Sequence, residues 1–473
     1  MLTFQDLLEV GEDENKRMDF VRRAIDTHKF CDDYKIAKMA NDYDTRKNTT
    51  IMNYRKLLYE ITGEAVDDNY SANYKLCSNF FNRFVTQQTQ YLLGNGVDWS
   101  DPATDEALGD DFDTRLQELA HNALVDKVGF GFWNLDHLEV FRFLEFVPLF
   151  DEEDGAMKAG IRFWQIDPTK PLRATLYELD GYTNYIWRTA EPEVLTPKRA
   201  YKLKARVSEA DGTEIYDEEN YPGFPIVPLW GNRAHQSELV GIQEGIDAYD
   251  LIKSGFANDV DDASLIYWTI NNAGGMDDID LAKFLNHMKR LKAAVVEEDG
   301  ATAESHSVEA PYASREALLN RIRADLYDDY MALDTKDIVG GANTATQIKA
   351  AYEPLNNKTD MFEYCVIDFL QGILELAGID DEPSFTRSMI VNTQEEIQTV
   401  LQAAEYVDGE YITRKVLTLL GDGDKADEIL ERMDMEDMER MSGGEEEEES
   451  DELDELEEDD DIDAQLDELE GGL

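Results

Sequence analysis

The chain has 473 residues, 42% of them apolar, which is enough for two or three ordinary domains or one large elongated subunit. Its 103 acidic and 44 basic residues give a net charge of −59, which excludes a protein that grips nucleic acid or an anionic membrane through a general basic face. Residues 441–473 contain 18 acidic and no basic residues, so −41 remains on residues 1–440 and the acidity is general.

The three cysteines, Cys31, Cys77 and Cys365, are far apart and odd in number, which indicates reduced thiols and no disulfide framework. The sequence contains no apolar run of 18 residues, and its first 20 residues do not have the pattern of a signal peptide. We therefore expect a soluble protein that is cytoplasmic where it is made and has no membrane partner.

The first part of the chain favours helices. Residues 1–65 are polar and predicted to be helical in pieces, and residues 71–99 predict one helix with a broad apolar side. Gly94 stands where the C-terminal cap of that helix belongs. A further helix is predicted around 112–128, ending at Gly129.

Strand signals dominate residues 129–230. The Asp180-Gly181 pair lies between two β-rich runs and predicts a hairpin. In residues 201–207 apolar and basic positions alternate, which predicts a half-buried strand.

The pattern then returns to helices. Helical spacing marks residues 237–263. A small α/β insert follows, with a strand at 264–270, a helix at 278–292 and a strand at 293–296. Later segments predict, in order, a helix at 314–334, a long helix that contains Pro354, a strand at 384–392, two helices to about 440, and a disordered acidic tail.

A glycine pair, Gly340-Gly341, opens the long helix and raises the question of a phosphate-binding loop. The first lysine after the pair is Lys349, more than a turn into the helix, whereas a Walker A loop needs Gly-Lys-Ser/Thr at its end. The pattern G-x-G-x-x-G is also missing. We interpret the glycines as a loop of unusual shape, and we expect Pro354 to kink the helix because it removes a helical hydrogen bond.

Residues that could act as nucleophiles, general bases or metal ligands form no catalytic pattern in the sequence, so no catalytic residue, cofactor or metal site is predicted. The six histidines have no metal-ligand spacing, and no serine or cysteine has a paired base nearby in sequence. Asp259, Asp261 and Asp262 are a candidate carboxylate cluster, although solvated helix ends have the same composition. One basic group stands out, which predicts either a solvated face or a contact with DNA or an acidic protein: Lys283, Lys289, Arg290 and Lys292.

Five blocks, taken in order, resemble the portal proteins of tailed bacteriophages, most closely those of long-tailed phages of Gram-positive hosts. The similarity covers about residues 45–440, and Asn95-Gly96 departs from the Lys-Pro that often follows the first block's glycine in the family. The blocks are "SNFFNRFVTQQTQYLLGNGV" (78–97), "FVPLFDEEDGAMKAGIRFWQID" (146–167), "FPIVPLWGNRAHQSELVGIQEGIDAYDLIKSGFANDVDDA" (224–263), "GANTATQIKAAYEPLNNKTDMFE" (341–363) and "YITRKVLTLLGDGDKADEILERMDME" (411–436).

The resemblance implies an α+β portal fold with a β-rich wing, a two-helix stem, a small α/β clip, a long kinked tunnel helix, a helical crown and a disordered acidic tail. The implied regions are 1–236 (N-terminal helices and wing), 237–262 and 314–332 (stem helices), 263–313 (clip), 333–392 (tunnel loop, tunnel helix and return strand), 393–440 (crown) and 441–473 (tail). The implied tunnel loop is Lys336, Asp337, Ile338, Val339, Gly340, Gly341, Ala342, Asn343 and Thr344. The tunnel helix would run from Thr346 to about Gly378.

By resemblance, the chain would form a ring of twelve subunits at one capsid vertex, through which double-stranded DNA is packaged and ejected. Its implied partners are the terminase large subunit, which holds the ATPase, the head-completion or adaptor protein, the major capsid protein and the scaffolding protein. It would be found in the virion, and in the host cytoplasm during assembly. General acidity agrees with a channel that DNA must slide through without sticking.

Two other interpretations remain open at this point. The first is an acidic metal-dependent enzyme such as a nuclease, with Asp259, Asp261 and Asp262 as metal ligands. The second is a different phage structural or adaptor protein that assembles without a channel wide enough for DNA.

Overall fold

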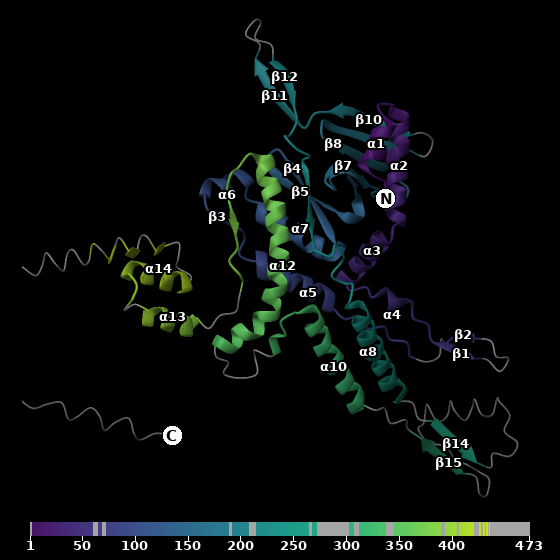
Figure 1. The fold of residues 1–473 in the computed structure, drawn as a ribbon. Coiled ribbons are helices and arrows are strands. Elements are labelled where there is room, and N and C mark those ends of the chain that lie inside the picture. The colour runs from purple at the N-terminus through teal and green to yellow at the C-terminus, as the bar shows by residue number, and fades with distance from the viewer. Residues whose placement is uncertain are drawn as a thin grey trace, which may run out of the picture. The chain divides into compact units, whose positions relative to one another are not determined.

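The computed structural model describes residues 2–59, 65–68, 72–188, 192–207, 214–263, 267–271, 302–306, 312–336, 345–388, 393–403, 406–420 and isolated positions from 425 to 435. The chain divides into a large unit, Met1–Ile390, and a small unit, Val391–Leu473. Both helices and antiparallel strands build the large unit (Figure 1). Within the described residues, no helix is both long and apolar enough to cross a membrane.

The helices of the large unit are α1 (Phe4–Val10), α2 (Glu14–Phe30), α3 (Asp32–Asp44), α4 (Thr49–Asn53), α5 (Phe80–Leu93), α6 (Pro102–Leu108), α7 (Phe112–Asp126), α8 (Gln243–Ala263), α10 (Tyr312–Tyr330) and α12 (Ala345–Ala377), with a 3-10 turn η1 (Phe143–Glu145). The strands are β1 (Leu57–Tyr59), β2 (Ala65–Asp67), β3 (Asp98–Trp99), β4 (Val128–Asn134), β5 (His137–Arg142), β6 (Phe146–Phe150), β7 (Met157–Trp164), β8 (Leu172–Glu178), β9 (Gly181–Trp187), β10 (Pro192–Arg199), β11 (Lys202–Val207), β12 (Glu214–Glu219), β13 (Ile226–Trp230), β14 (Tyr267–Asn271), β15 (Thr302–His306) and β16 (Pro383–Ser384).

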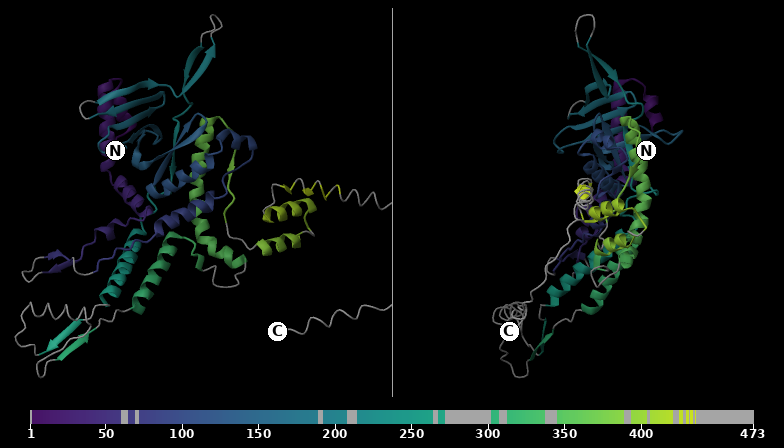
Figure 2. Two further views of the ribbon diagram at one scale, coloured as in Figure 1. Left: turned by 180° about the vertical axis from the view of Figure 1, so that it is seen from behind. Right: turned by 90° about the vertical axis from the view of Figure 1, so that its left-hand side faces the viewer.

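The body of the large unit is layered. A five-stranded antiparallel sheet, β10-β9-β8-β7-β6, is covered on one face by α1 and α2, where Phe20, Val21 and Ile25 are fully buried. Its other face packs through Phe146 and Tyr177 on a three-stranded sheet, β13-β4-β5. Helices α7 and α12 pack on the far face of this second sheet (Figures 1 and 2).

Glycines in β4 let the two helices approach that sheet closely. Phe130 and Phe132 point toward the five-stranded sheet, so the intervening Gly131 faces the helices. A Cβ atom at Gly131 would lie 2.6 Å from Phe369 of α12. The glycines of residues 126–136 therefore lie inside a strand, and their role is close packing.

The hairpin predicted at Asp180-Gly181 is confirmed, since β8 and β9 pair with Glu178 opposite Gly181. All strands from β4 to β13 fall within residues 128–230, as the strand signals predicted. The alternating strand at 201–207 forms only a two-stranded ribbon, β11–β12, and its Leu203 is 61% exposed, so the prediction of half-burial was wrong at that residue.

Two predicted helix boundaries were wrong. Residues 72–79 are extended, and the helix predicted over 71–99 begins only at Phe80. Helix α7 ends at Asp126, and its cap is Lys127, whose φ of 92° places a lysine in the left-handed region.

The later strands also differ from the prediction. The partner of β14 is β15 at Thr302–His306, which the sequence did not predict, whereas the strand predicted at 293–296 lies outside the described residues. The strand predicted at 384–392 is reduced to β16, two residues that pair with β3, and residues 389–392 lie outside the described part.

The small unit contains the two predicted helices, α13 (Thr393–Gln402) and α14 (Gly409–Leu420), which pack against each other. Most of residues 421–440 and the whole of the predicted tail lie outside the described residues.

The burial of His28 leads us to predict how the free energy of unfolding depends on pH. Its Nε2 lies 2.8 Å from the carbonyl oxygen of Phe143, and burial lowers the pKa of the imidazole from 6.5 to about 4. Between those pH values the unfolded chain therefore binds a proton that the folded chain does not, and stability falls as the pH falls. We expect wild type to lose about 3 kcal/mol more than His28→Gln between pH 7 and pH 4.

Urea unfolding at several pH values measures this difference, and His137→Gln, at a half-exposed site, is the matched control. Parallel curves for wild type and His28→Gln would show that His28 titrates normally in the folded chain.

Candidate functional site

A row of buried polar side chains joins α8 to the extended segment 72–79. Asp250, Ser254 and Asn258 stand four residues apart on α8 and are buried. Their side-chain oxygens accept hydrogen bonds from the backbone N–H groups of Ser78 (2.8 Å), Leu76 (2.9 Å) and Tyr74 (2.7 Å), respectively. We call these six residues the stem clamp.

The spacing of the stem clamp follows from the two backbone geometries. Four residues of α-helix rise about 6 Å, and two residues of extended chain rise about 6.6 Å, so the two rows stay in register over two repeats. An extended segment outside a sheet has N–H groups that need acceptors when they are buried. The polar row on α8 supplies them, and this fixes the direction of the helix relative to the body.

A second set of contacts holds the N-terminal helices to the same part of α8. Asn48 donates from Nδ2 to Asp250 (2.9 Å), while its Oδ1 accepts from the Ile51 N–H (3.1 Å) and caps α4. The Tyr43 hydroxyl donates to Asp247 of α8. Burial raises the pKa of the Asp250 carboxyl, and the hydrogen bonds from Asn48 and Ser78 oppose that rise.

Helices α8 and α10 leave the body side by side (Figure 1). Asp259 of α8 forms an ion pair with Arg315 of α10, and the rings of Phe256 and Tyr312 lie 5.6 Å apart. The Asp259 carboxylate thus joins two helices. No group of three metal-ligating side chains occurs among the described residues, which exclude the side chain of Asp262.

Helix α5 holds both ends of the segment predicted to be the tunnel loop. Gln87 forms two 3.0 Å hydrogen bonds with the backbone of Leu333, one through its amide nitrogen and one through its oxygen. Tyr91, one turn further on, stacks on Tyr352 of α12 with ring centroids 5.6 Å apart. Leu333, Tyr352 and Leu355 form one buried cluster with Tyr91.

Helix α12 carries an acidic stripe on its exposed side. Glu353, Asp360, Asp368 and Glu375 are exposed and follow one another at intervals of seven, eight and seven residues, which places them on one side of the helix. The stripe extends roughly 33 Å at 1.5 Å per residue. Between residues 353 and 377 no lysine or arginine of α12 itself is exposed, because Lys358 is half-buried and paired with Glu238. Two arginines from other segments lie beside the stripe: Arg387 pairs with Asp360 (2.7 Å), and Arg233 lies over the ring of Tyr364 (5.4 Å).

The predicted site residues are placed only in part. Lys336 is exposed and its N–H bonds to Asp334, whereas residues 337–344 lie outside the described part of the chain. Pro354 lies inside α12, and this helix bends near its N-terminal end (Figure 1). The basic group in the predicted clip falls outside the described residues: Lys283, Lys289, Arg290 and Lys292.

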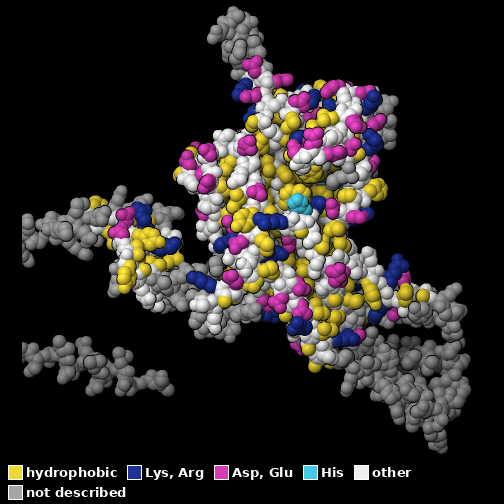
Figure 3. All heavy atoms as spheres, viewed as in Figure 1, with side chains coloured by type: hydrophobic (Ala, Val, Ile, Leu, Met, Phe, Trp, Pro, Cys, Tyr) yellow, Lys and Arg dark blue, Asp and Glu magenta, His cyan; other side chains and the backbone are white. Residues whose placement is uncertain are grey.

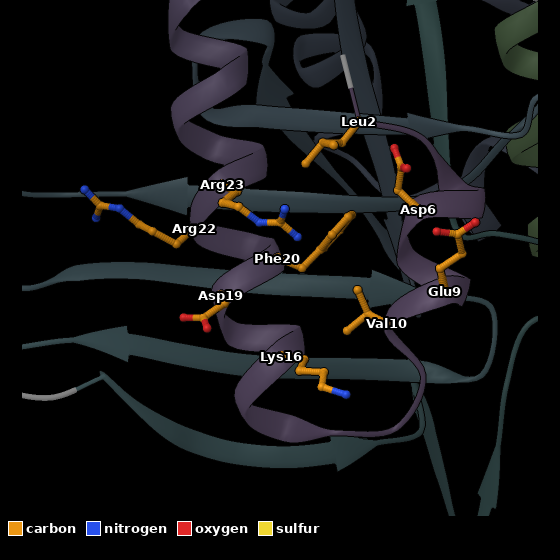
Figure 4. Close-up of a pocket in the computed structure, with 9 residues that line it drawn as sticks. All are labelled: Leu2, Asp6, Glu9, Val10, Lys16, Asp19, Phe20, Arg22 and Arg23. Atoms are coloured by element: carbon orange, nitrogen blue, oxygen red, sulfur yellow. The ribbon is translucent and has the colours of Figure 1, made fainter.

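A hollow of about 610 Å³ lies beside α1 and α2 (Figure 4). Its lining contains three carboxylates, from Asp6, Glu9 and Asp19, and three basic side chains, from Lys16, Arg22 and Arg23. Such a mixed lining selects no ligand charge, so the hollow does not define a site.

The comparisons with known proteins agree on one family. The family model for phage portal proteins of the SPP1 Gp6-like type matches residues 28–442. The portal protein of Bacillus phage SPP1 is 24% identical over 389 residues, which are 74% of this chain and 73% of that protein. The portal protein of Clostridium phage phiCD119 is 24% identical over 206 residues, 42% of this chain, and the match spans less than half (46%) of the relative.

Solved structures similar to the chain include necks of gene transfer agent particles. The neck of an empty particle, computed with C6 symmetry, has a TM-score of 0.42 and 12% identity, covering 72% of this chain and 90% of that one. The neck of a native particle, computed with C12 symmetry, has a TM-score of 0.40 and 11% identity, covering 71% and 89%.

The family match over residues 28–442, with two portal proteins among the relatives, defines the chain as a protein of the phage head-to-tail connection. It belongs to the phage portal protein family. The predicted family and class are therefore confirmed, and the alternative of a metal-dependent nuclease is left without support.

The stem clamp predicts a local stability effect. Asp250→Ala removes the acceptor of the Ser78 N–H and of Asn48, which leaves two buried donors unpaired and costs about 2 kcal/mol or more. We expect the amides of residues 72–79 to exchange with deuterium at least about tenfold faster.

Hydrogen–deuterium exchange with peptide resolution measures this change. Val260→Ala, on an exposed part of the same helix, is the control and should leave the exchange of residues 72–79 unchanged. Unchanged exchange in Asp250→Ala would show that the clamp does not hold the segment.

Proposed function

We propose that the chain forms a closed ring at one capsid vertex, twelvefold by its resemblance to portal proteins, and that double-stranded DNA is packaged and ejected through the ring axis. The observation that carries the proposal is the acidic stripe of α12, together with a family assignment that covers residues 28–442. In this proposal α12 borders the channel, the stem clamp orients the stem, and Pro354 bends the tunnel helix.

The charge of the stripe suits DNA that must move in both directions. Duplex DNA carries one negative charge per about 1.7 Å of axis, so a basic wall would bind it and create deep energy minima. Carboxylates on the wall keep the phosphates away over about one Debye length, roughly 8 Å at physiological salt. Acidic side chains are also spread over the face of the molecule that Figure 3 shows. The ring would then guide DNA by shape and not by adhesion.

The described residues on either side of the tunnel loop support its proposed role. Leu333 precedes the loop and Tyr352 follows it, and both contact α5. A loop held at both ends by one helix can change shape without disturbing the ring. Twelve such loops around one axis would contact DNA together, which a single loop cannot do.

The partners follow from the resemblance. The clip would dock the terminase large subunit, which supplies the ATPase, and later the head-completion or adaptor protein. Its basic residues Lys283, Lys289, Arg290 and Lys292 would contact DNA or terminase. Major capsid and scaffolding proteins would surround the ring during assembly in the host cytoplasm. The chain itself would hydrolyse nothing, since the portal family is structural.

Charge reversal on the stripe tests the channel wall. Glu353→Lys, Asp368→Lys and Glu375→Lys together should leave ring assembly intact, because all three side chains are exposed. They should raise the ring's affinity for duplex DNA at least about tenfold at low salt and slow packaging in vitro, because phosphates gain partners.

The matched control is the triple variant Glu9→Lys, Glu153→Lys and Glu218→Lys, which changes the net charge equally at exposed sites on α1, the β6–β7 turn and β12. Equal DNA affinity and packaging rate in both triple variants would place the stripe away from the DNA path.

Shortening the loop tests its assignment separately. Deletion within residues 337–345 should leave rings visible by negative-stain electron microscopy and impair DNA packaging or retention. Normal packaging and retention by the shortened protein would be incompatible with the tunnel-loop assignment.

A further inference from the structure

The pair Asn95-Gly96, which departs from the Lys-Pro that is frequent in the family, has no part in the proposed function. Asn95 is exposed in the turn between α5 and β3, and the sequence contains no other Asn-Gly pair. Asparagine is among the thermolabile residues, and it is least stable before glycine, because no side chain on the following residue hinders attack by the backbone nitrogen. The pair is therefore a candidate for spontaneous deamidation.

Both residues of the pair have a structural role. Gly96 has a φ of 83°, in the left-handed region, and a Cβ atom there would lie 2.2 Å from Oδ2 of Asp113, so the turn requires glycine at this position. Asn95 donates from Nδ2 to the carbonyl oxygen of Thr386 at 3.0 Å. This hydrogen bond ties the end of α5 to the segment that follows α12.

The attacking nitrogen is held only by the last turn of a helix. The Gly96 N–H donates to the carbonyl oxygen of Leu93 at 3.1 Å, and the ends of helices fray. The same oxygen accepts from Nε2 of Gln117 at 2.8 Å, so it keeps a partner when the Gly96 N–H leaves. Release of the nitrogen therefore avoids the cost of an unpaired buried acceptor.

We propose that Asn95 deamidates spontaneously in the folded protein, and that the product releases residues 383–388 from the end of α5. Hydroxide removes the proton of the Gly96 nitrogen, which then forms a bond to Cγ of Asn95. The bond between Cγ and Nδ2 breaks, and the nitrogen leaves as ammonia after taking a proton from water. Water then opens the succinimide ring and gives aspartate or isoaspartate at position 95, with no oxidant, reductant or enzyme.

Either product opposes the contact with Thr386. A carboxylate at position 95 has no proton to donate, and it would face the Thr386 carbonyl oxygen. The Thr386 hydroxyl already donates to Oδ2 of Asp98 at 2.7 Å, so a second carboxylate would lie close to the first. The turn is acidic as it stands, since burial, together with the charges of Asp105 and Asp98, raises the pKa of the Asp113 carboxyl.

Isoaspartate has a further effect, because the main chain then runs through the former side-chain carbon. This adds one carbon atom between α5 and β3. Strand β3 pairs with β16 through two residues on each side, and so short a ladder has little capacity to absorb a shift. The released segment carries Arg387, which pairs with Asp360 of the acidic stripe at 2.7 Å.

Ageing of the purified full-length protein tests the chemistry. At neutral pH and body temperature, Asn95 should convert at least about tenfold faster than Asn15, which is equally exposed but is followed by lysine, and mildly alkaline pH should accelerate the conversion. Peptide mass spectrometry measures both sites, and labelling by isoaspartyl methyltransferase identifies the isoaspartate. Asn95→Gln keeps the amide donor but must close a larger ring, so it should remain unconverted.

Hydrogen–deuterium exchange tests the structural consequence on the same samples. Residues 383–388 should exchange at least about threefold faster in aged than in fresh wild type, whereas aged and fresh Asn95→Gln should exchange alike. Freshly purified Asn95→Asp carries the charge without the added carbon and should show part of the effect. Asn15→Gln is the matched control and should age as wild type does.

The outcomes separate the two parts of the proposal. If Asn95 stays intact in the folded protein while it converts in the urea-unfolded chain, the fold protects the site and the proposal is overturned. If Asn95 converts but the exchange of residues 383–388 is unchanged, the modification site stands and the release of the segment is overturned. None of these measurements requires ring assembly, so their result is independent of the proposed function.

Discussion

The arrangement of the stem depends on one requirement, that the buried N–H groups of the extended segment 72–79 find acceptors. The segment has no neighbouring strand, so the acceptors come from Asp250, Ser254 and Asn258 on α8. Each of these side chains accepts a hydrogen bond from a backbone N–H group. The clamp therefore constrains where residues 74–78 lie, but it does not require particular side chains at those positions. The clamp acts together with the Asn48 and Tyr43 contacts to α8 and with the buried Leu326, Tyr327 and Tyr330 of α10 to fix both helices relative to the layered sheets.

Helix α5 extends this constraint toward the channel side of the proposed ring. It begins two residues after Ser78, so the clamp sets its starting point, and its Gln87 and Tyr91 then hold Leu333 and Tyr352. Helix α8, helix α5 and the residues Leu333 and Tyr352, which flank the proposed tunnel loop, are thus joined by short, specific contacts. A displacement of the stem would reach the loop through packed side chains, which is the kind of physical connection that coupling between distant sites requires.

Sequence periodicity was sufficient for most of the helices and for the Asp180-Gly181 hairpin, because those signals are local, but it missed the hairpin β1–β2 in residues predicted to be helical and the strand β15. The sequence-based prediction failed where contacts between distant segments determine the local backbone conformation. Residues 72–79 have helix-compatible side chains, and only the acceptors on α8, some 170 residues later, make the extended form favourable. The block containing Asp247, Asp250, Ser254 and Asn258 carried the resemblance, but its chemical reason required the structure. A lysine cap at Lys127 has no sequence signal, since lysine rarely adopts positive φ.

A strongly acidic subunit faces two opposing demands if it is to form a ring around DNA. Its channel wall must repel phosphates, yet twelve such subunits also repel one another. A uniform reduction of charge would weaken both effects together. The charge is instead uneven along the chain, with carboxylates along α12 and four basic and no acidic side chains in residues 45–58. In the proposed ring, contacts between neighbouring subunits would act at short range, whereas salt screens the repulsion between charges more than about one Debye length apart, so the net charge of −59 can coexist with assembly.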